Sequence, residues 1–477
     1  MAPSDYRQGF RTLDSEVEAA ALPVSGTLRF WLHGTLVRNG PARFEAGTRP
    51  MRHWFDGLAM LHRFTLDAHR VSYANKYVRS PAYAFIAEHE RLGYPEFATD
   101  PCRSIFKRLT THFWPEFGHN TSVNVTRLAD RFLAWTETPL PIEFDPRTLD
   151  TIGVHHFDDQ LDTIANSPHP HLDPTTGDAI NAGVAFSRTS TYKVYRIAGD
   201  SGRRQIIAEV PVAEPAYMHS FSLTSSSIVL AEYPLVVNPL QMLLRGRPYA
   251  ENLVWKPERP TRFLVIRQRD GELLGQYEAP PFFSFHHVNA FERDGEICVD
   301  LLAYSDATVI RALYLDVLQG SRDATLQQPR SELRRYRLRQ GSTTAELEVL
   351  SGESLELPRI NYERYHTRDY RFVYGVSIQD RDAGTWFDRL AKVDLATGTT
   401  LHWHVPGCYP GEPVFVPAPG ARDEDDGVLL SVVLDSTRGC SFLLVLDARS
   451  MEECARAEAP HVIPFGFHGS YFGDIAS

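Results

Sequence analysis

The chain has 477 residues, of which 43% are hydrophobic and 11% aromatic, a composition typical of a folded protein without long disordered arms. A formal charge of -11, with no local run of lysine or arginine to offset it, disfavours a nucleic acid partner. The five cysteines are scattered and show no C-x-x-C spacing. They therefore argue against a disulfide framework and a zinc site, and favour a reducing cytosol.

Neither end of the chain nor its longest apolar stretch predicts export or a membrane span. The N-terminal residues carry charges where a signal peptide has its apolar core. The longest apolar stretch, from Ser227 to Leu244, is interrupted by Glu232, Pro234 and Pro239, so we do not expect it to cross a bilayer. A cytoplasmic location follows as the expectation.

Segments of strand length with alternating apolar residues recur along the chain, whereas stretches with helical periodicity are few. Examples in chain order are residues 131–137, 191–197, 262–268, 427–435 and 442–448. Asp with Pro, Ser, Thr or Gly separates pairs of such segments, as in residues 143–152, 171–180, 392–403 and 445–455. These residue types close tight turns between antiparallel strands. The fold class is therefore predicted to be all-β.

Repeated hairpins in a chain of this length favour a β-propeller. A closed ring of four-stranded blades leaves only short edges, so residues 1–477 could form a single domain. Paired β-sandwiches would show two separable halves and a β-helix a short fixed period, and the sequence shows neither. The irregular spacing of the hairpins indicates insertions, which would form a cap of loops and short helices over one face.

Two segments interrupt the strand pattern and are the predicted cap insertions. Residues 101–117 place large apolar side chains at helical spacing with basic residues between them, and residues 234–250 contain the apolar run PLVVNPLQMLL. Each segment is equally compatible with a core-packed cap helix and with a surface patch that dips into a lipid monolayer. The sequence leaves this choice open.

Four of the 19 histidines lie in apolar or aromatic strand-like surroundings that favour an inward-facing imidazole: His169, His219, His286 and His468. They are far apart in the sequence, so no single helix or hairpin could bring them together. Innermost strands of different propeller blades do converge on one axis, which would allow a shared metal site. Spacing alone, however, favours four unrelated histidines.

The chain is identified as resembling a known family through a series of ordered motifs that cover nearly its whole length. They are GTLVRNGPARFEAG, HWFDGLAMLHRF, DPCRSIF, HPHLDP, MHSFSLT, FHHVNAFE, LELPRINYERY, GEPVFVPAPGARDEDDGVLLSVVLD and PFGFHG. These motifs resemble those of the carotenoid cleavage oxygenases, which include apocarotenoid-forming dioxygenases, β-carotene oxygenases, the retinal pigment epithelium isomerase and bacterial stilbene oxygenases. The resemblance implies a seven-bladed propeller that uses one Fe²⁺ and O₂ to cut a C=C bond of an apolar polyene into two carbonyl products.

Carried over by position, the resemblance implies that His169, His219, His286 and His468 are the iron ligands. The adjacent His171 and His287 are left out because the family's ligand is the first histidine of each pair. The resemblance also implies that Glu137 serves His219, Glu356 serves His286 and Glu412 serves His468. An imidazole that binds metal through one nitrogen needs an acceptor for its other N–H, and a carboxylate meets that need.

Two positions near the expected site bear on the reaction and its substrate. Val123 aligns with a threonine that several oxygenases carry near the open iron position, so its methyl groups are expected to crowd that position. Thr136 stands where stilbene-cleaving relatives carry a phenol-binding lysine. A buried phenol without a hydrogen-bond partner costs on the order of 1 to 3 kcal/mol, which favours a carotenoid or apocarotenoid over a stilbenoid.

Access to a polyene dissolved in lipid implies peripheral association with a membrane surface, and we expect no obligate protein partner. The predicted docking residues are Ile105, Phe106, Phe113, Trp114, Leu235, Val236, Val237, Leu240 and Leu243. Three alternatives stay open beside a carotenoid cleavage dioxygenase. They are a stilbenoid-cleaving dioxygenase, a non-oxidative retinoid isomerase-like protein, and a carotenoid-binding propeller without iron.

Overall fold

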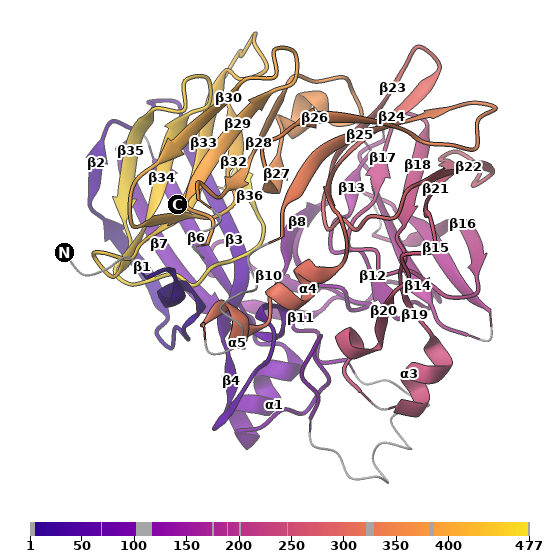
Figure 1. Cartoon of the computed structure of the whole chain (residues 1–477). Helices are drawn as coiled ribbons and strands as arrows, with labels where there is room; N and C mark the ends of the chain where they lie inside the picture. The colour runs from indigo at the N-terminus through magenta and orange to yellow at the C-terminus, as the bar shows by residue number, and fades with distance from the viewer. Residues whose placement is uncertain are drawn as a thin grey trace.

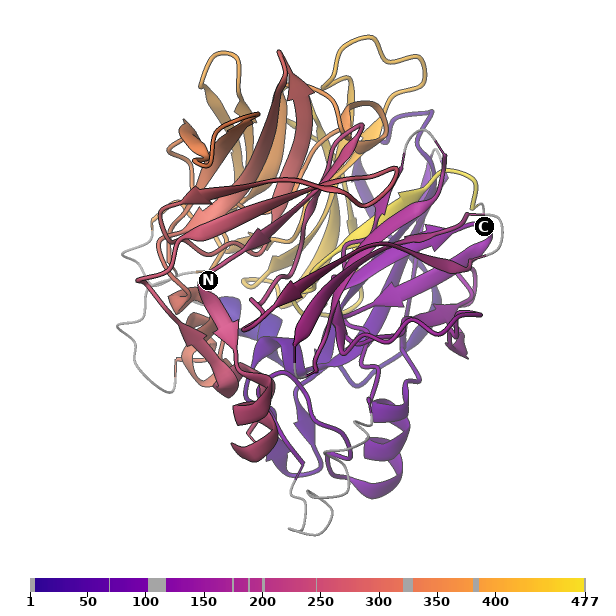
Figure 2. The ribbon, with the colours of Figure 1, turned by 90° about the vertical axis from the view of Figure 1, so that its right-hand side faces the viewer.

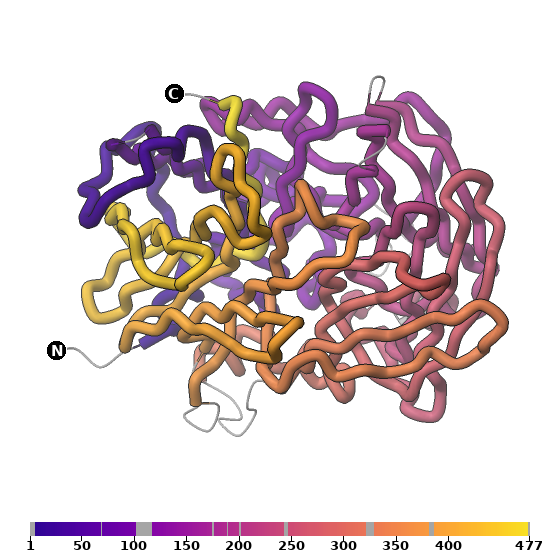
Figure 3. Tube along the Cα trace, turned by 90° about the horizontal axis from the view of Figure 1, so that it is seen from above, coloured from indigo at the N-terminus to yellow at the C-terminus, as the bar shows by residue number. Residues whose placement is uncertain are grey.

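Seven antiparallel sheets are arranged around a common axis in the computed structural model, and they form a seven-bladed β-propeller (Figures 1 and 3). The structure describes residues 5–67, 69–101, 117–173, 176–187, 189–199, 202–245, 247–320, 329–380 and 386–475. In Figure 3 the chain runs once around the ring, and its yellow C-terminal part returns beside the indigo N-terminal part. The predicted all-β class and propeller architecture are confirmed.

The blades follow one another in chain order. In order of hydrogen-bonded neighbours, the first four are β1 (Val17–Leu22), β7 (Arg70–Tyr77), β6 (Leu58–Asp67), β3 (His33–Arg43) and β36 (Gly469–Phe472); β11 (Thr151–Val154), β10 (Ile142–Phe144), β9 (Arg131–Trp135) and β8 (Asn124–Leu128); β12 (Ala165–Asn166), β14 (Ala179–Ala185), β15 (Ser190–Ile197) and β16 (Arg204–Val212), with β13 (His171–Leu172) on β14; and β17 (Ser222–Leu223), β18 (Ser227–Glu232), β21 (Thr261–Arg267) and β22 (Leu273–Ala279).

The last three blades complete the ring. They are β23 (His287–Arg293), β24 (Glu296–Tyr304), β25 (Ser331–Arg339) and β26 (Glu346–Ser351); β27 (Glu356–Arg359), β28 (Phe372–Ser377), β29 (Arg389–Asp394) and β30 (Thr400–His404); and β2 (Val24–Gly26), β35 (Glu453–Glu458), β34 (Cys440–Asp447), β33 (Gly427–Asp435) and β31 (Cys408–Pro410), with β32 (Val414–Pro417) on β33.

Both ends of the chain take part in closing the ring. The C-terminal β36 pairs with β3 of the first blade, with Arg38 opposite Gly469, and the N-terminal β2 pairs with β35 of the last blade. The Thr35 hydroxyl also donates to the Ile475 carbonyl at 2.9 Å. This exchange removes two free sheet edges. Because the exchange ties the first residues to the last, we propose that the chain forms one domain.

Apolar clusters fill the boundaries between neighbouring blades. For example, Leu61 of β6 and Ala134 of β9 belong to one buried cluster between the first two blades, and Val194 of β15 packs with Leu264 of β21 between the third and fourth. Side chains alternate between the two faces of each strand, so each blade contributes apolar residues to two such clusters. The alternating segments predicted as strands are β9, β15, β21, β33 and β34, and this prediction is confirmed.

A cap covers one end of the propeller, shown at the bottom in both side views (Figures 1 and 2). Its elements within the described residues are α1 (Pro81–His89), α3 (Pro239–Arg245), α4 (Thr308–Ala312), α5 (Leu315–Leu318), the 3-10 turns η1 (Tyr6–Phe10), η2 (Trp54–Asp56) and η3 (Tyr249–Asn252), and the hairpins β4 (Glu45–Ala46) with β5 (Arg49–Pro50) and β19 (Leu235–Val237) with β20 (Leu253–Trp255). A short α6 (Tyr362–Tyr365) belongs to the sixth blade's inner loop.

The apolar run that begins at Leu235 is a strand followed by a helix, which corrects part of the predicted docking surface. Leu235, Val236 and Val237 form β19, pair with β20, and expose 3%, 3% and 0% of their surface. They pack into the core under the cap and cannot contact lipid. Leu240, on α3, is 64% exposed. The docking residues Ile105, Phe106, Phe113 and Trp114 and the side chain of Leu243 lie outside the described residues.

The described residues contain no helix long and apolar enough to cross a membrane. Four cysteines, Cys298, Cys408, Cys440 and Cys454, are free thiols.

Candidate metal centre

Four histidines from distant parts of the sequence meet on the propeller axis. Each stands at the start of an innermost strand: His169 two residues before β13, His219 before β17, His286 next to β23 and His468 next to β36. These inner strands contact one another across the axis, as β17 does β23 and β36 does β8. One ring nitrogen from each of the four histidines lies within 4.8 Å of the others. The structure thus brings together all four histidines that the sequence singled out.

The orientation of the rings fits a bound cation. The Nε2 atoms of His286 and His468 are 3.2 Å apart, and those of His169 and His219 are 3.0 Å apart. Two donors about 2.1 Å from one ion and at right angles to each other would be separated by roughly 3 Å. Burial lowers the pKa of His468 to about 3, although Glu412 opposes this, so the ring is neutral at physiological pH.

A carboxylate stands behind three of the four rings. The Nδ1 atom of His219 lies 2.7 Å from Glu137, that of His286 lies 2.6 Å from Glu356, and that of His468 lies 2.7 Å from Glu412. An ionised carboxylate only accepts hydrogen bonds, so the imidazole proton must sit on Nδ1. The Nε2 atoms of His286 and His468 therefore present lone pairs to each other, an arrangement that needs a cation between them.

The three carboxylates are themselves held by different partners. The Tyr217 hydroxyl donates to Glu137 at 2.7 Å, and the Tyr304 hydroxyl donates to Glu356. The Leu357 amide also donates to Glu356 at 3.0 Å. Burial would raise the pKa of Glu356, but the proximity of His286 and these hydrogen bonds lower it overall. The carboxylate is therefore kept ionised and available to His286.

Glu412 is held most tightly, by two guanidinium groups. It is fully buried, Arg359 Nε donates to it at 2.8 Å, and Arg38 forms a short ion pair with it. The amide of Gly469 also donates to Glu412 at 3.0 Å. Burial would raise the pKa of Glu412, but Arg359, His468 and Arg38 together hold it well below its usual value. The closing strand β36 is thus anchored at the point where it delivers His468.

His169 is fixed through its backbone rather than by a carboxylate, as far as the described residues show. The Ser167 hydroxyl accepts from the His169 amide at 3.1 Å and donates to the His219 carbonyl at 2.8 Å. The neighbouring histidines make other contacts. His171 lies 3.0 Å from the Phe221 carbonyl and 3.0 Å from the Tyr362 hydroxyl, and His287 hydrogen-bonds to Ser222 and Tyr233.

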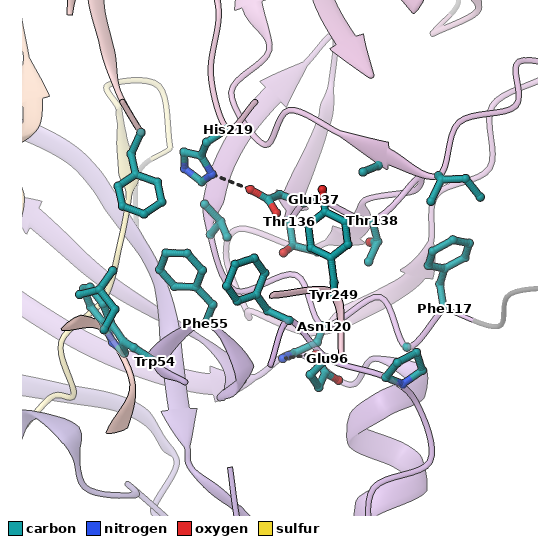
Figure 4. Close-up of a pocket in the computed structure, with 18 of the residues that line it drawn as sticks. Trp54, Phe55, Glu96, Phe117, Asn120, Thr136, Glu137, Thr138, His219 and Tyr249 are labelled. Carbon is teal, nitrogen blue, oxygen red and sulfur yellow. Dashed lines mark hydrogen bonds and ion pairs between the residues drawn. The ribbon is translucent and has the colours of Figure 1, made fainter. Parts of the chain in front are cut away.

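The imidazole cluster opens onto a cavity of about 1040 Å³ that extends toward the cap (Figure 4). His219, His286 and His468 line it, as do the apolar and aromatic side chains of Trp54, Phe55, Phe97, Tyr249, Phe285 and Phe387. The volume is at the upper end of the range for small-molecule sites. Aromatic rings continue away from the histidines, with Phe285 5.6 Å from His219 and Phe55 5.8 Å from Phe285 between ring centroids.

Val123 and Thr136 both line this cavity. Val123 is 7% exposed, and its carbonyl accepts from the His468 amide at 3.1 Å, so it lies directly beside that ring. Sequence reasoning did not assign a role to Arg38, Arg359, Tyr217 or Tyr304. The two arginines lie in the motifs GTLVRNGPARFEAG and LELPRINYERY, but only the folded chain shows that both reach Glu412.

The fold and the ring geometry place the chain among β-propellers with a histidine cluster on the axis. The model of the retinal pigment epithelial membrane protein family matches residues 10–473. The chain therefore belongs to this family.

Curated relatives and solved structures agree with this assignment. The chain is 35% identical to a carotenoid isomerooxygenase from Galleria mellonella and 34% identical to a mitochondrial carotenoid-cleaving dioxygenase from Mustela putorius furo. In both comparisons the match covers 96% of this chain and 95% of the relative. Cobalt-substituted apocarotenoid oxygenase from Synechocystis matches over 99% of both chains, with 27% identity and a TM-score of 0.87. That structure carries a metal, as the histidine geometry of this chain would allow.

Proposed function

We propose that the chain holds one Fe²⁺ ion on His169, His219, His286 and His468 and uses it with O₂ to cut a C=C bond of a carotenoid or apocarotenoid. The chain is a carotenoid cleavage dioxygenase, the class named for several of its relatives. The metal assignment depends above all on one observation, the facing lone pairs of His286 and His468 at 3.2 Å. Four neutral nitrogen donors suit a divalent transition metal, and a ferrous ion supplies the redox chemistry that lets O₂ react with a double bond.

The protein's own residues contribute position and dryness. Glu137, Glu356 and Glu412 fix three imidazoles in one tautomer and one orientation, which keeps the Nε2 lone pairs aimed at the axis. Val123 places methyl groups beside His468 and limits how many further groups can approach the ion. The aromatic cavity wall holds the double bond near the axis and excludes water. Both atoms of O₂ enter the two carbonyl products, so no reducing cosubstrate is required.

The cavity wall supports a long polyene over a stilbenoid. At Thr136 the wall offers a hydroxyl group and no lysine for a substrate phenol. The length of the aromatic wall, from Phe285 beside the histidines to Phe97 and Tyr249 in the cap, suits an extended conjugated chain.

Product analysis under ¹⁸O₂ tests the proposed reaction. Iron-loaded protein is incubated with carotenoids, apocarotenals and resveratrol, and the carbonyl products are examined by mass spectrometry. We expect a polyene to give two carbonyl products, each with one ¹⁸O atom, and iron analysis to give one ion per chain. Cleavage of resveratrol alone would overturn the substrate assignment. Double-bond isomerisation without ¹⁸O uptake would indicate an isomerase-like protein, and substoichiometric iron would indicate a binding protein.

We further propose that the cap docks on the cytoplasmic surface of a membrane. Leu240 both lines the cavity and is 64% exposed, so it stands at the cavity mouth. An exposed leucine at the opening of an apolar cavity suits a protein that takes a water-insoluble polyene from a lipid monolayer. Ile105, Phe106, Phe113, Trp114 and Leu243 remain the other proposed contacts.

A further inference from the structure

A carboxyl group lines the otherwise largely apolar cavity, and the metal chemistry does not use it. Glu96 precedes the predicted insertion and contributes to the cavity wall together with Asn120. Figure 4 shows Glu96 beside Asn120, apart from the paired Glu137 and His219, with Phe55 and Tyr249 between the two groups in this view. Glu96 therefore marks a second polar position in the cavity, separate from the histidines.

The partner of Glu96 is already committed elsewhere. The Asn120 amide nitrogen lies 2.9 Å from the Gly57 carbonyl, 3.3 Å from the Asp56 carbonyl and 3.4 Å from Glu96, so Glu96 receives the longest of three contacts. The Asn120 oxygen accepts from the Ala59 amide at 2.9 Å. Asn120 thus secures the backbone at the start of β6 and satisfies Glu96 only weakly.

The carboxyl group carries its proton. Burial and then the nearby carboxylate of Asp56 raise the pKa of Glu96 well above its usual value. Within the part of the chain that the structure describes, no lysine, arginine or histidine forms an ion pair with Glu96. A protonated carboxyl has an O–H donor, and the same residues offer that donor no acceptor. An acceptor supplied by a ligand in the cavity would complete the hydrogen bonding.

We propose that Glu96 donates a hydrogen bond to an oxygen atom near one end of the substrate, so that the cavity selects an oxygenated polyene over a pure hydrocarbon. Aldehyde, ketone and alcohol oxygens all accept such a bond. This inference rests on the proposed function and adds a substrate-selecting residue to it. Fixing one end of a rigid conjugated chain also fixes which double bond reaches the histidines. The cleaved bond is then counted from the oxygenated end and does not change when the other end is lengthened.

Binding without turnover tests the selection. Iron-loaded, full-length protein is titrated under anaerobic conditions with an apocarotenal, with the matching alcohol, and with the hydrocarbon in which a methyl group replaces the oxygenated group. We expect wild-type protein to bind the aldehyde about tenfold more tightly than the hydrocarbon, the difference that one buried hydrogen bond makes. Glu96→Leu should abolish this preference, and Glu96→Gln, which keeps N–H donors, should retain most of it. The alcohol arm shows whether hydroxyl oxygens are held as well as carbonyl oxygens.

Glu88→Leu is the matched control, since Glu88 lies on the exposed face of α1 outside the cavity, and its substitution should leave both affinities unchanged. An unchanged preference in Glu96→Leu, or an equal loss of affinity for aldehyde and hydrocarbon, would overturn the proposal. Infrared spectroscopy gives a second readout on wild-type protein, which decides the matter if Glu96→Leu does not fold. The carbonyl stretch of the bound aldehyde should shift to lower wavenumber than in hydrocarbon solvent, and an unshifted band contradicts the proposal.

The two proposals fail separately. If the aldehyde preference depends on Glu96 but no carbonyl products form in air, the selection is right and the cleavage function is wrong. If cleavage proceeds and the preference does not depend on Glu96, only the selection is wrong.

Discussion

The axial histidine cluster and the cap over it lie at two ends of the same cavity but are stabilised in different ways. On the axis, polar groups are paired in successive layers, from imidazole to carboxylate to tyrosine or arginine. In the cap, aromatic rings pack on one another, as Trp54 does on Phe467 at 4.3 Å between centroids, and polar groups such as Glu96 are weakly paired.

This difference separates chemistry from selection. A hydrogen-bonded network in a buried site has one low-energy geometry, because each unpaired polar group is costly, so the axis holds its donors rigidly. Aromatic packing depends on shape and tolerates changes of side chain at similar volume. We therefore expect substitutions on the axis to change whether metal is bound, and substitutions in the cap to change what is bound or where the protein docks.

The largest effect is expected from loss of an axial imidazole. His286→Ala removes one of four nitrogen donors and leaves Glu356 buried without its partner. Iron content should fall far below one ion per chain, and cleavage should drop to background. Elemental analysis and product formation measure both effects. Retention of full iron with normal cleavage would show that His286 is not a ligand and would break the proposed distinction at its centre.

A second comparison lies within the axis itself, between Glu412 and Glu137. Glu412→Gln leaves Arg38 and Arg359 without their buried counter-charge, whereas Glu137→Gln disturbs only Tyr217 and His219. Both variants should weaken iron binding about 10- to 100-fold. Glu412→Gln should in addition lower the free energy of unfolding by about 3 to 5 kcal/mol.

Competition with a chelator measures the affinity, and urea unfolding measures the stability. Equal stabilities for the two variants would mean that the guanidinium groups find other partners, and that the layers behind the three imidazoles are equivalent.

In the cap, His53 predicts how stability depends on pH. It is fully buried, accepts from the Phe55 amide at 3.1 Å, and lies 2.9 Å from the Ile310 carbonyl. Burial lowers the pKa of His53 to about 3. Between about pH 6.5, the value for an unfolded histidine, and pH 3, the unfolded chain therefore binds the extra proton, so stability falls as the pH falls.

The contribution of His53 is at most about 1.4 kcal/mol per pH unit in this window. His53→Asn keeps an acceptor at the start of η2 but removes the titration, so the loss of stability on acidification should be shallower. Urea unfolding between about pH 6.5 and 5 measures the slope. His33→Asn, at an exposed position, is the control. An identical slope in wild type and His53→Asn would mean that the buried ring takes up a proton without unfolding.

How much of this the sequence could predict follows from the range of the forces involved. Strands such as β15 and β33 are visible because alternation is local. The meeting of His169 with His468 depends on ring closure and was predictable only through the family motifs. The run at Leu235 was misjudged because three apolar residues do not distinguish a buried strand from a surface helix. Glu96 gave no signal, since its neighbours Asp56 and Asn120 join it only in the folded chain.

The smallest effect is expected at the outer edge of the cap. Leu240 is 64% exposed, so Leu240→Ser should change the free energy of unfolding by less than about 0.5 kcal/mol. If part of its side chain enters lipid, the substitution should cost about 1 kcal/mol of membrane binding, roughly a fivefold decrease in partition. Liposome flotation measures this, with Val349→Ser as the control, because Val349 is 54% exposed on β26, away from the cap. Equal partition of both variants and wild type would show that the cavity mouth does not touch lipid. The cap would then select its substrate from solution or from a carrier, and the contrast with the axis would concern ligand choice alone.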